Sequence, residues 1–256
     1  MSLNFENIDA PCEDVKSCIA EKFRRIGLIS NEHLRLLAKF EDNPAEIRAG
    51  TEILSQDNPT NEFFVINKGW VVSSMKNITG VNTVIDIHHP GDIVGVSQLP
   101  YESSPYSSVT ATNCVICPFP RNSLDDLLKI SPRLSGMFQT VCMIEQAILH
   151  DRIAMMSASE AHVRLCHFLL QTFSRLKFMN SDLTDRFYCP LNQRTIGEAI
   201  GVTSVHVSRT FAKLAEMGLI ERNRNFVRFV DWQRAVKFTG FTDRYENVDV
   251  AWLPDA

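Results

Sequence analysis

The stretch that decides the fold is Asn192-Gln-Arg-Thr-Ile-Gly-Glu-Ala-Ile-Gly-Val-Thr-Ser-Val-His-Val-Ser-Arg-Thr-Phe211. Asn192 and Thr203 are residue types that cap helices, because their side-chain oxygens accept hydrogen bonds from backbone N–H groups of the first turn. Gly201 lies between the two predicted helices and can end the first one, since glycine adopts a left-handed backbone without steric cost. The stretch therefore predicts a helix-turn-helix that runs from Gln193 to about Ala212.

The apolar residues of this stretch predict how the two helices pack. Ile196 and Ile200 lie one helical turn apart and face inward, and Gly197 between them lets the second helix approach closely. Val202 fills the turn, and the inner face of the second helix consists of Val207, Phe211 and Leu214. The alternative, a helical hairpin in an enzyme, lacks this combination of turn glycine, capping threonine and buried aliphatic residues. The outward side chains are expected to read base edges in a DNA major groove: Ser204, Val205, His206, Ser208 and Arg209.

A basic hairpin is predicted directly after the second helix. Leu219–Arg222 and Phe226–Val230 have the composition of strands and flank a turn, Asn223-Arg224-Asn225, which makes this segment a wing. Residues 186–237 carry nine Lys and Arg against four Asp and Glu, although the whole chain has a net charge of −4, so this end suits a polyanion. Phosphate contacts fix the register of a protein on DNA, and we expect them from Gln193, Arg194, Thr203, Lys213, Arg222 and Arg224.

The region upstream has the texture of an antiparallel β-structure. Between Ile47 and Cys117, short β-type runs alternate with turn signals. Lys68-Gly69 is expected to be the turn of a tight hairpin, Thr83–His88 a strand that stops at Pro90-Gly-Asp, and Val109–Phe119 a further strand. A helix is expected over Phe23–Phe40. Strands at this spacing indicate a barrel or roll.

A long helix is predicted from Pro132, and it is apolar on two faces. One stripe contains Met137, Val141, Ile144, Ile148 and Met155, and a second contains Phe138, Cys142, Leu149, Ile153 and Met156. A helix with two apolar faces must be buried on both, which favours one face on the β-domain and the other on the same helix of a second subunit. A central helix of a monomer is the alternative. The residues expected along the dimer helix are Met137, Val141, Ile144, Ile148, Leu149 and Met155.

Taken together, these residues resemble the CRP/FNR family of bacterial transcription regulators. The helix-turn-helix, the trailing Leu214…Gly218-Leu-Ile and Pro90-Gly-Asp-Ile-Val-Gly95 carry the likeness, which covers roughly residues 20–235. It implies an α+β fold with an N-terminal antiparallel β-roll of the cyclic-nucleotide-binding type, a long dimerisation helix and a C-terminal winged helix-turn-helix. It also implies a homodimer on double-stranded DNA and an activator that contacts RNA polymerase. The expected divisions are an arm at 1–22, a sensor at 23–131, the dimerisation helix at 132–158, the DNA-binding domain at 159–237 and a tail at 238–256.

The departures from the family pattern place the chain with the FNR/FixK-like branch rather than the cyclic-AMP-binding branch. Cyclic-AMP-binding members carry an acid after the Pro-Gly-Asp turn and an Arg-Ser pair further on, but here Gly95 is followed by Val96. The later stretch is Tyr106-Ser-Ser-Val109, with no arginine before it, and burying an unpaired phosphate is costly. We therefore expect no cyclic AMP site. In the second helix of the helix-turn-helix, Val205 replaces a glutamate that many members carry. The operator is therefore expected to differ at the base pair that this side chain faces.

The seven cysteines raise the question of an iron–sulfur cluster. Oxygen-sensing members of the family hold one, and Cys12, Cys18 and Cys117 resemble some of its ligands. A [4Fe–4S] cluster normally takes four thiolates, and the N-terminal group here has two, with Asp9 as a candidate oxygen ligand. We expect free thiols and no cofactor, and the cluster remains the alternative.

Other function classes find little support in the sequence. No apolar run approaches the roughly 20 residues that cross a bilayer, and the acidic N-terminus is not a secretory signal, so we expect a cytoplasmic protein. No Gly-rich phosphate loop or nucleophile elbow indicates an enzyme. A cupin-like enzyme would need a clustered His/Glu metal set that the barrel stretch lacks. A β-roll module that regulates a protein partner without DNA binding is the remaining alternative, and the basic reading helix argues against it.

Overall fold

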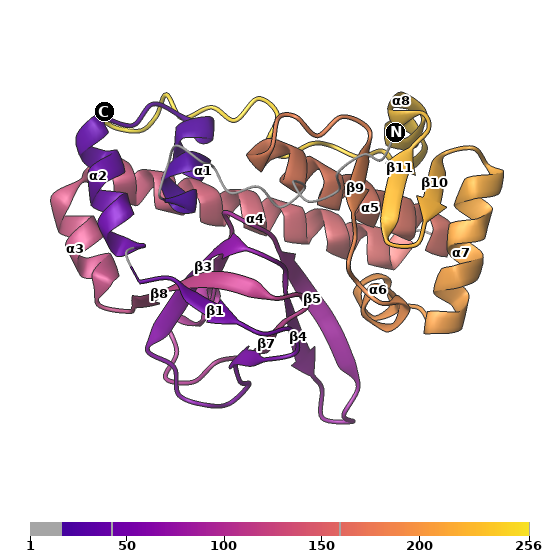
Figure 1. Ribbon diagram of the computed structural model, residues 1–256, viewed down its shortest axis with the longest axis horizontal. Coiled ribbons are helices and arrows are strands. Elements are labelled where there is room, and N and C mark those ends of the chain that lie inside the picture. Colours follow the sequence, from indigo (N-terminus) through magenta and orange to yellow (C-terminus); the bar gives the residue numbers. More distant parts are fainter. Residues whose placement is uncertain (1–16, 42, 159, 256) are drawn as a thin grey trace, which may run out of the picture. The chain divides into compact units, whose positions relative to one another are not determined.

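The computed structural model describes residues 17–41, 43–158 and 160–255. It is a mixed α+β structure with antiparallel sheets in its N-terminal half, one long helix and a C-terminal helix-turn-helix (Figure 1), as the sequence predicts. The chain forms two compact units. The first contains the described residues up to Met75, residues 87–142 and those from Asp249 on, and the second contains Lys76–Asp86 and Met143–Val248.

The first unit begins with two short helices, α1 (Cys18–Ile26) and α2 (Asn31–Phe40). The single helix expected over Phe23–Phe40 is therefore wrong. Gly27 interrupts it with an extended backbone, at φ −171°, and Ser30 starts the second helix because its side chain accepts a hydrogen bond from His33 N. Helix α1 begins at Cys18, so the expected division between residues 22 and 23 falls inside a helix.

Two four-stranded antiparallel sheets form the β-roll. One has the order β1-β8-β3-β6 and the other β2-β7-β4-β5. Their bounds are β1 (Ala45–Ile47), β2 (Glu52–Leu54), β3 (Glu62–Lys68), β4 (Val71–Lys76), β5 (Asn82–His88), β6 (Ile93–Val94), β7 (Ser107–Thr110) and β8 (Cys114–Pro120). A 3-10 turn, η1 (Val96–Gln98), and helix α3 (Ser123–Ile130) complete the N-terminal half.

Two expectations about strand pairing are corrected by these sheets. The turn at Lys68-Gly69 joins β3 to β4, but these strands lie in different sheets, so it is not a hairpin. Gly69 has φ 91°, and a Cβ there would lie 2.5 Å from the carbonyl oxygen of Asn113, which explains the glycine. The run Val109–Phe119 is divided between β7 and β8, again in different sheets.

The long helix α4 (Pro132–Ala158) begins where the sequence predicts. Four residues of its first stripe, Met137, Val141, Ile144 and Ile148, are at most 8% exposed within this one chain. A side chain already buried in its own chain has little surface to give to a partner, so their expected place in a dimer seam stays a prediction that these burial values do not favour. Met155 is half-buried. In the second stripe, Leu149, Ile153 and Met156 are exposed.

The second unit packs helices against a small sheet. Helix α5 (Ala161–Met179) contributes Leu165, Leu169 and Phe173 to its core, at the spacing of one helix face. The sheet has the order β10-β11-β9, and its strand β9 spans Arg186–Tyr188. Phe173 lies 5.6 Å from Phe229 and 5.1 Å from Trp232, between ring centroids. Trp232 opens a final helix, α8 (Trp232–Thr239), which runs past the division expected at 237.

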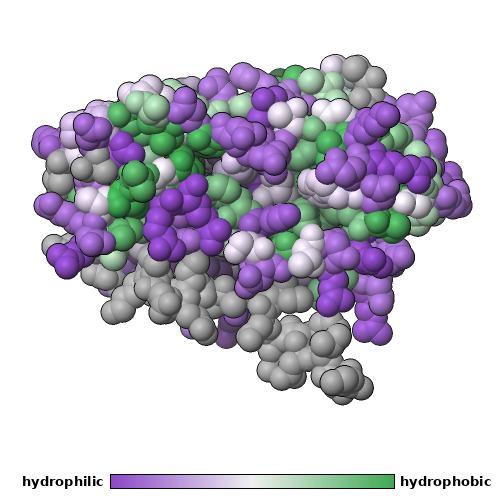
Figure 2. All heavy atoms as spheres, turned by 90° about the horizontal axis from the view of Figure 1, so that it is seen from above, coloured by the Kyte–Doolittle hydropathy of each residue, from purple (hydrophilic) through white to green (hydrophobic). Residues whose placement is uncertain are grey.

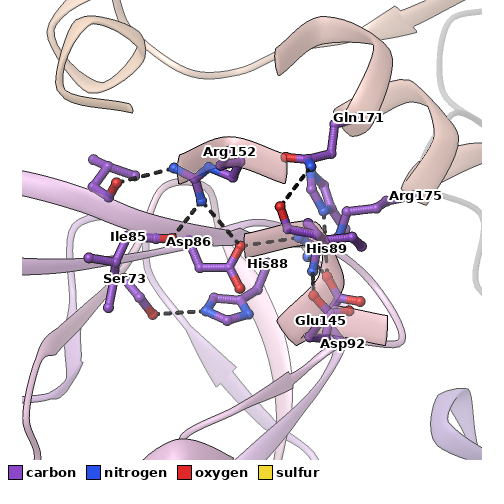
Figure 3. Close-up of polar contacts among 12 residues, drawn as sticks. Ser73, Ile85, Asp86, His88, His89, Asp92, Glu145, Arg152, Gln171 and Arg175 are labelled. Carbon is purple, nitrogen blue, oxygen red and sulfur yellow. Dashed lines mark hydrogen bonds and ion pairs between the residues drawn. The ribbon is translucent and has the colours of Figure 1, made fainter. Parts of the chain in front are cut away.

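Within this second unit, ion pairs and hydrogen bonds connect Ile85 and Asp86 of β5 to the helices α4 and α5 (Figure 3). Arg175 is 5% exposed and lies 3.1 Å from Asp86 of β5 and 2.8 Å from Glu145 of α4. Arg152 of α4 donates to the carbonyl oxygen of Ile85 at 2.5 Å. Removing one partner of such a buried pair typically costs about 3–5 kcal/mol, so these contacts hold this part of β5 against α4 and α5.

Candidate nucleic-acid interface

The helix-turn-helix consists of α6 (Gln193–Ile200) and α7 (Ser204–Glu216). Asn192 Oδ1 accepts a hydrogen bond from Thr195 N at 2.9 Å, and Thr203 Oγ1 accepts one from His206 N at 3.4 Å. Gly201 ends α6 in the left-handed conformation, at φ 69° and ψ 42°. The two caps and the turn glycine have the conformations expected from the sequence, since each depends on residues close together in the chain.

The inward residues of both helices form one small core. Ile196, Ile200, Val207, Phe211 and Leu214 are at most 5% exposed. A Cβ on Gly197 would lie 2.5 Å from the backbone oxygen of Val202, so only glycine allows this turn to lie against α6. The close packing fixes the direction of α7 relative to α6.

The expected base-reading residues gather on the solvent face of α7. Ser204, Val205, His206, Ser208 and Arg209 are all exposed, Val205 to 65%. The face offers hydroxyl groups, an imidazole, an aliphatic side chain and a guanidinium, which together can donate, accept and contact methyl groups. The part of the molecule that contains α7 and the wing, at the right in Figure 2, is mainly hydrophilic. The structure thus brings these five side chains together at one accessible surface.

The residues expected at phosphates lie around this face. Gln193, Arg194 and Thr203 are exposed at the starts of the two helices, where backbone N–H groups also favour anions. Arg194 Nε lies 2.9 Å from Glu198 of the same helix, and Lys213 Nζ lies 3.7 Å from Glu160. Both cations are exposed, and water and salt weaken ion pairs of exposed side chains, so a phosphate can take over either cation.

The wing is a two-residue hairpin. Strands β10 (Ile220–Asn223) and β11 (Phe226–Phe229) pair from Asn223 opposite Phe226. Arg224 occupies the turn at φ 53° and is exposed, as a wing-tip residue should be. Arg222 lies in strand β10, outside the turn. Its guanidinium lies over the ring of Phe211, 4.0 Å from the centroid, because a weakly hydrated planar cation stacks well on an aromatic face.

One charged cluster of the wing was not expected from the sequence. Arg228 lies 2.7 Å from Asp185 and 3.0 Å from Glu221. The hydrogen bond from Arg228 lowers the pKa of Asp185, and hydrogen bonds to both acids raise the pKa of Arg228. The alternating run Arg186-Phe187-Tyr188 was the sequence signal for β9, the strand that follows Asp185. Arg228 therefore stands with two acids, and its charge is largely balanced.

The two β-roll segments considered for cyclic AMP, at Gly95–Gln98 and Tyr106–Ser108, make hydrogen bonds within the chain. Gly95 has φ 96° and precedes η1, and Gln98 Nε2 donates to the carbonyl oxygen of Glu62 at 2.8 Å. Ser97 Oγ lies 3.1 Å from the hydroxyl of Tyr106. Ser108 is fully buried and bonds to Ser73 at 2.7 Å. These contacts occupy Gln98 Nε2, Ser97 Oγ and Ser108 Oγ, whereas Gln98 Oε1 is buried without a hydrogen-bond partner. The sequence places no Lys or Arg among Val96–Gln98 or Tyr106–Ser108.

Two of the three cysteines considered for a cluster lie near one residue. Cys18 Sγ donates to the backbone oxygen of Asn67 at 3.8 Å, and Asn67 Nδ2 donates to Cys117 Sγ at 3.4 Å. Both thiols are buried, whereas Cys12 lies outside the described residues. Within the described ranges, no group of three or more His, Cys, Asp or Glu residues is placed to hold a metal ion. Two thiols are half of the four that a [4Fe–4S] cluster normally takes, so the described residues do not fit one.

Two protein families match this chain. A model of cyclic nucleotide-binding domains matches residues 44–131, and a model of Crp-like helix-turn-helix domains matches residues 163–234. The transcriptional regulatory protein btr of Bordetella pertussis (strain Tohama I) is 24% identical over 80% of this chain and 84% of its own. The transcriptional activator protein FnrA of Stutzerimonas stutzeri is 22% identical over 72% of this chain and 75% of its own.

A solved structure shows the same fold. FixK2 from Bradyrhizobium japonicum superposes with a TM-score of 0.69 at 21% identity, over 77% of this chain and 96% of its own. With the geometry of α6, α7 and the wing, these likenesses define a DNA-binding transcription regulator. The chain belongs to the CRP/FNR family. Among the residues that the structure describes, no helix is long and apolar enough to span a membrane.

Proposed function

We propose that the protein binds an inverted-repeat operator as a homodimer and activates transcription. The observation that carries this proposal is the exposed polar face of α7, fixed by two side-chain caps and by the close packing at Gly197. A two-fold dimer with one reading helix per subunit contacts successive major grooves about 34 Å apart, so the half-sites should be inverted. Contact with RNA polymerase and a cytoplasmic location are parts of the same proposal, supported by the transcriptional activators among the relatives.

In the proposed complex, Arg209 pairs with a guanine and Val205 contacts a thymine methyl group. A guanidinium matches guanine O6 and N7, whereas valine offers methyl groups and has no acceptor for a cytosine amino group. Ser204, His206 and Ser208 supply further donors and acceptors. We assign the phosphate contacts to Gln193, Arg194, Thr203, Lys213 and Arg224, with Arg222 reaching phosphate only if it leaves the ring of Phe211.

The dimer seam is assigned to the second stripe of α4. Leu149, Ile153 and Met156 are 42%, 58% and 42% exposed, and they recur at steps of four and three residues. A row of large apolar side chains on a soluble helix marks an interaction surface. The same helix of a second copy is the natural partner, because a two-fold axis brings identical rows together.

Cyclic AMP is excluded from the proposed activity. Ser97, Gln98 Nε2 and Ser108 already make hydrogen bonds within the chain, and Val96–Gln98 and Tyr106–Ser108 include no cation that would balance a buried phosphate. Calorimetric titration with cyclic AMP should therefore give no saturable heat, and a micromolar dissociation constant would contradict this part of the proposal. We also propose that the cysteines remain free thiols. Iron and sulfide in protein purified without oxygen would contradict it.

Selection of operators from a random DNA library tests the proposal most directly. The wild type should yield an inverted repeat whose half-sites share a guanine, and Val205→Glu should shift one base pair toward C·G by about 1–3 kcal/mol. Glu216→Gln, an exposed residue at the last position of α7, serves as a matched control on the same helix, because it changes none of the assigned DNA contacts. Identical base profiles for wild type and Val205→Glu would show that residue 205 does not reach a base. A wild type that selects no sequence would favour the alternative, a β-roll module that regulates a protein partner without binding DNA.

A further inference from the structure

A cavity of about 390 Å³ lies within the second unit, between α5, α8 and the segment that follows α8. This size falls within the range of small-molecule sites in proteins. The lining combines aromatic rings with charges of both signs, and its principal residues are Lys177, Phe178, Trp232, Gln233, Tyr245 and Glu246. The reading face of α7 contributes nothing to the lining, so the cavity is separate from the DNA interface.

The aromatic walls of the cavity are held by contacts with neighbouring rings and with Glu145. Tyr245 stacks on Phe178, with ring centroids 4.4 Å apart and planes 26° apart, and its hydroxyl donates to Glu145 at 2.8 Å. Trp232 packs against Phe173 at 5.1 Å and Phe229 at 5.2 Å. Rings fixed in this way offer flat apolar surfaces to a ligand at little cost in side-chain entropy.

The charges of the lining differ in how far they are already satisfied. Asp243 Oδ1 accepts hydrogen bonds from Ser174 Oγ at 2.6 Å and from Tyr245 N at 3.0 Å. Glu246 is exposed and is therefore the acid more accessible to a ligand. The Lys177 ammonium lies 5.9 Å from the centroid of the Phe173 ring, a loose contact that a carboxylate can replace.

We propose that this cavity binds a small amphoteric aromatic molecule, one that carries an ammonium, a carboxylate and a flat ring, as an aromatic amino acid does. The ring lies against Trp232 and Tyr245, the ligand carboxylate pairs with Lys177, and the ligand ammonium pairs with Glu246. A ligand with only one of the two charges leaves either Lys177 or Glu246 without a counter-charge. This inference goes beyond the proposed function and does not depend on DNA binding.

Isothermal titration calorimetry of the full chain tests the inference with three probes that share one ring. L-Phenylalanine should bind saturably, and phenethylamine, which lacks the carboxylate, and 3-phenylpropanoate, which lacks the ammonium, should bind at least tenfold more weakly. Equal affinities for phenylalanine and either analogue would overturn the amphoteric assignment. No saturable heat with phenylalanine, tyrosine or tryptophan up to about 10 mM would overturn the site, because even a millimolar site would be filled.

Two exposed variants locate the binding. Lys177→Met and Glu246→Gln should each weaken phenylalanine binding at least tenfold, while Lys237→Met, an exposed lysine of α8 outside the lining, should leave it unchanged. Glu246→Gln should bind 3-phenylpropanoate at least as well as the wild type does, since the repelling acid is gone. Wild-type phenylalanine affinity in both Lys177→Met and Glu246→Gln would overturn the proposal.

Discussion

Replacing Gly197 by alanine tests the packing that aims the reading helix. The new Cβ would lie 2.5 Å from the backbone oxygen of Val202 and 3.4 Å from Cγ2 of Val207. A backbone oxygen cannot rotate away, so α7 and its turn must shift, and overpacking of this kind costs about 1–3 kcal/mol. Alanine regains about 1 kcal/mol over glycine inside a helix. With the clash near the upper end of its range, we expect a net loss of about 2 kcal/mol.

Urea unfolding and operator titration together measure this loss. The variant should unfold at lower urea with an unchanged slope, and its operator affinity should fall because α7 no longer lies at its native angle. Gly136→Ala is the matched control: it is also a helical glycine, but its Cβ would meet Leu253 Cδ2, the end of a side chain that can rotate. That control should lose less than about 1 kcal/mol and bind the operator normally. A Gly197→Ala protein as stable as the wild type, with full operator affinity, would refute the reasoning.

Other predictions follow from the interface, the helix α4 and a buried histidine. Arg209→Ala should weaken binding to the best operator by about 1–3 kcal/mol and relax its specificity, whereas Arg224→Ala should weaken binding to all DNA sequences and reduce the salt slope of the affinity by about one. Mobility shifts at several salt concentrations measure both effects. If Arg209→Ala binds the operator as tightly as the wild type does, α7 is not the helix that reads the bases in the way proposed. Ile153→Glu should sediment as a monomer, because it brings charge into the exposed apolar stripe of α4. Ile148→Glu should instead lower the free energy of unfolding, because that residue is 4% exposed in its own chain. A stable, dimeric Ile153→Glu protein would exclude the exposed stripe as the dimer seam. Burial lowers the pKa of His167 to about 4, from an ordinary value of 6.5. As the pH falls below 6.5, the His167 side chain takes up a proton in the unfolded chain before it does so in the folded one. The contribution of neutral His167 to the free energy of unfolding is therefore complete above pH 6.5 and falls by about 3 kcal/mol as the pH approaches 4. His167→Phe should flatten the acid side of a plot of unfolding free energy against pH, and an unchanged plot would contradict the lowered pKa of His167.

The helix-turn-helix could be predicted because its signals are local. Asn192, Gly201 and Thr203 act on backbone groups within a few residues of themselves, so their spacing determines where the helices start and stop. The wing is equally local, since two residues separate its paired strands at Asn223 and Phe226. The beginning of α4 at Pro132 was predicted on the same basis, because proline favours the first turn of a helix.

Pairings between distant segments could not be predicted in this way. Lys68-Gly69 has the local composition of a hairpin turn, yet β3 pairs with β8, about fifty residues further on, with Val65 opposite Cys117. A turn motif predicts that the chain reverses its direction. Which strand then pairs with which depends on the apolar faces that meet when both sheets close. The division of Val109–Phe119 between two sheets has the same cause.

The sequence by itself therefore determined the class of protein and the positions of the two helices of the helix-turn-helix, through motifs that act within one or two turns of helix. Tertiary structure decided which apolar stripe of α4 is buried, because Ile148 and Ile153 are equally hydrophobic and only packing distinguishes them. It also placed Arg222 over the ring of Phe211 and formed a cavity from residues of α5, α8 and the segment that follows α8. Burial and ring contacts depend on residues that are far apart in the chain, and their proximity arises only when the whole fold has formed.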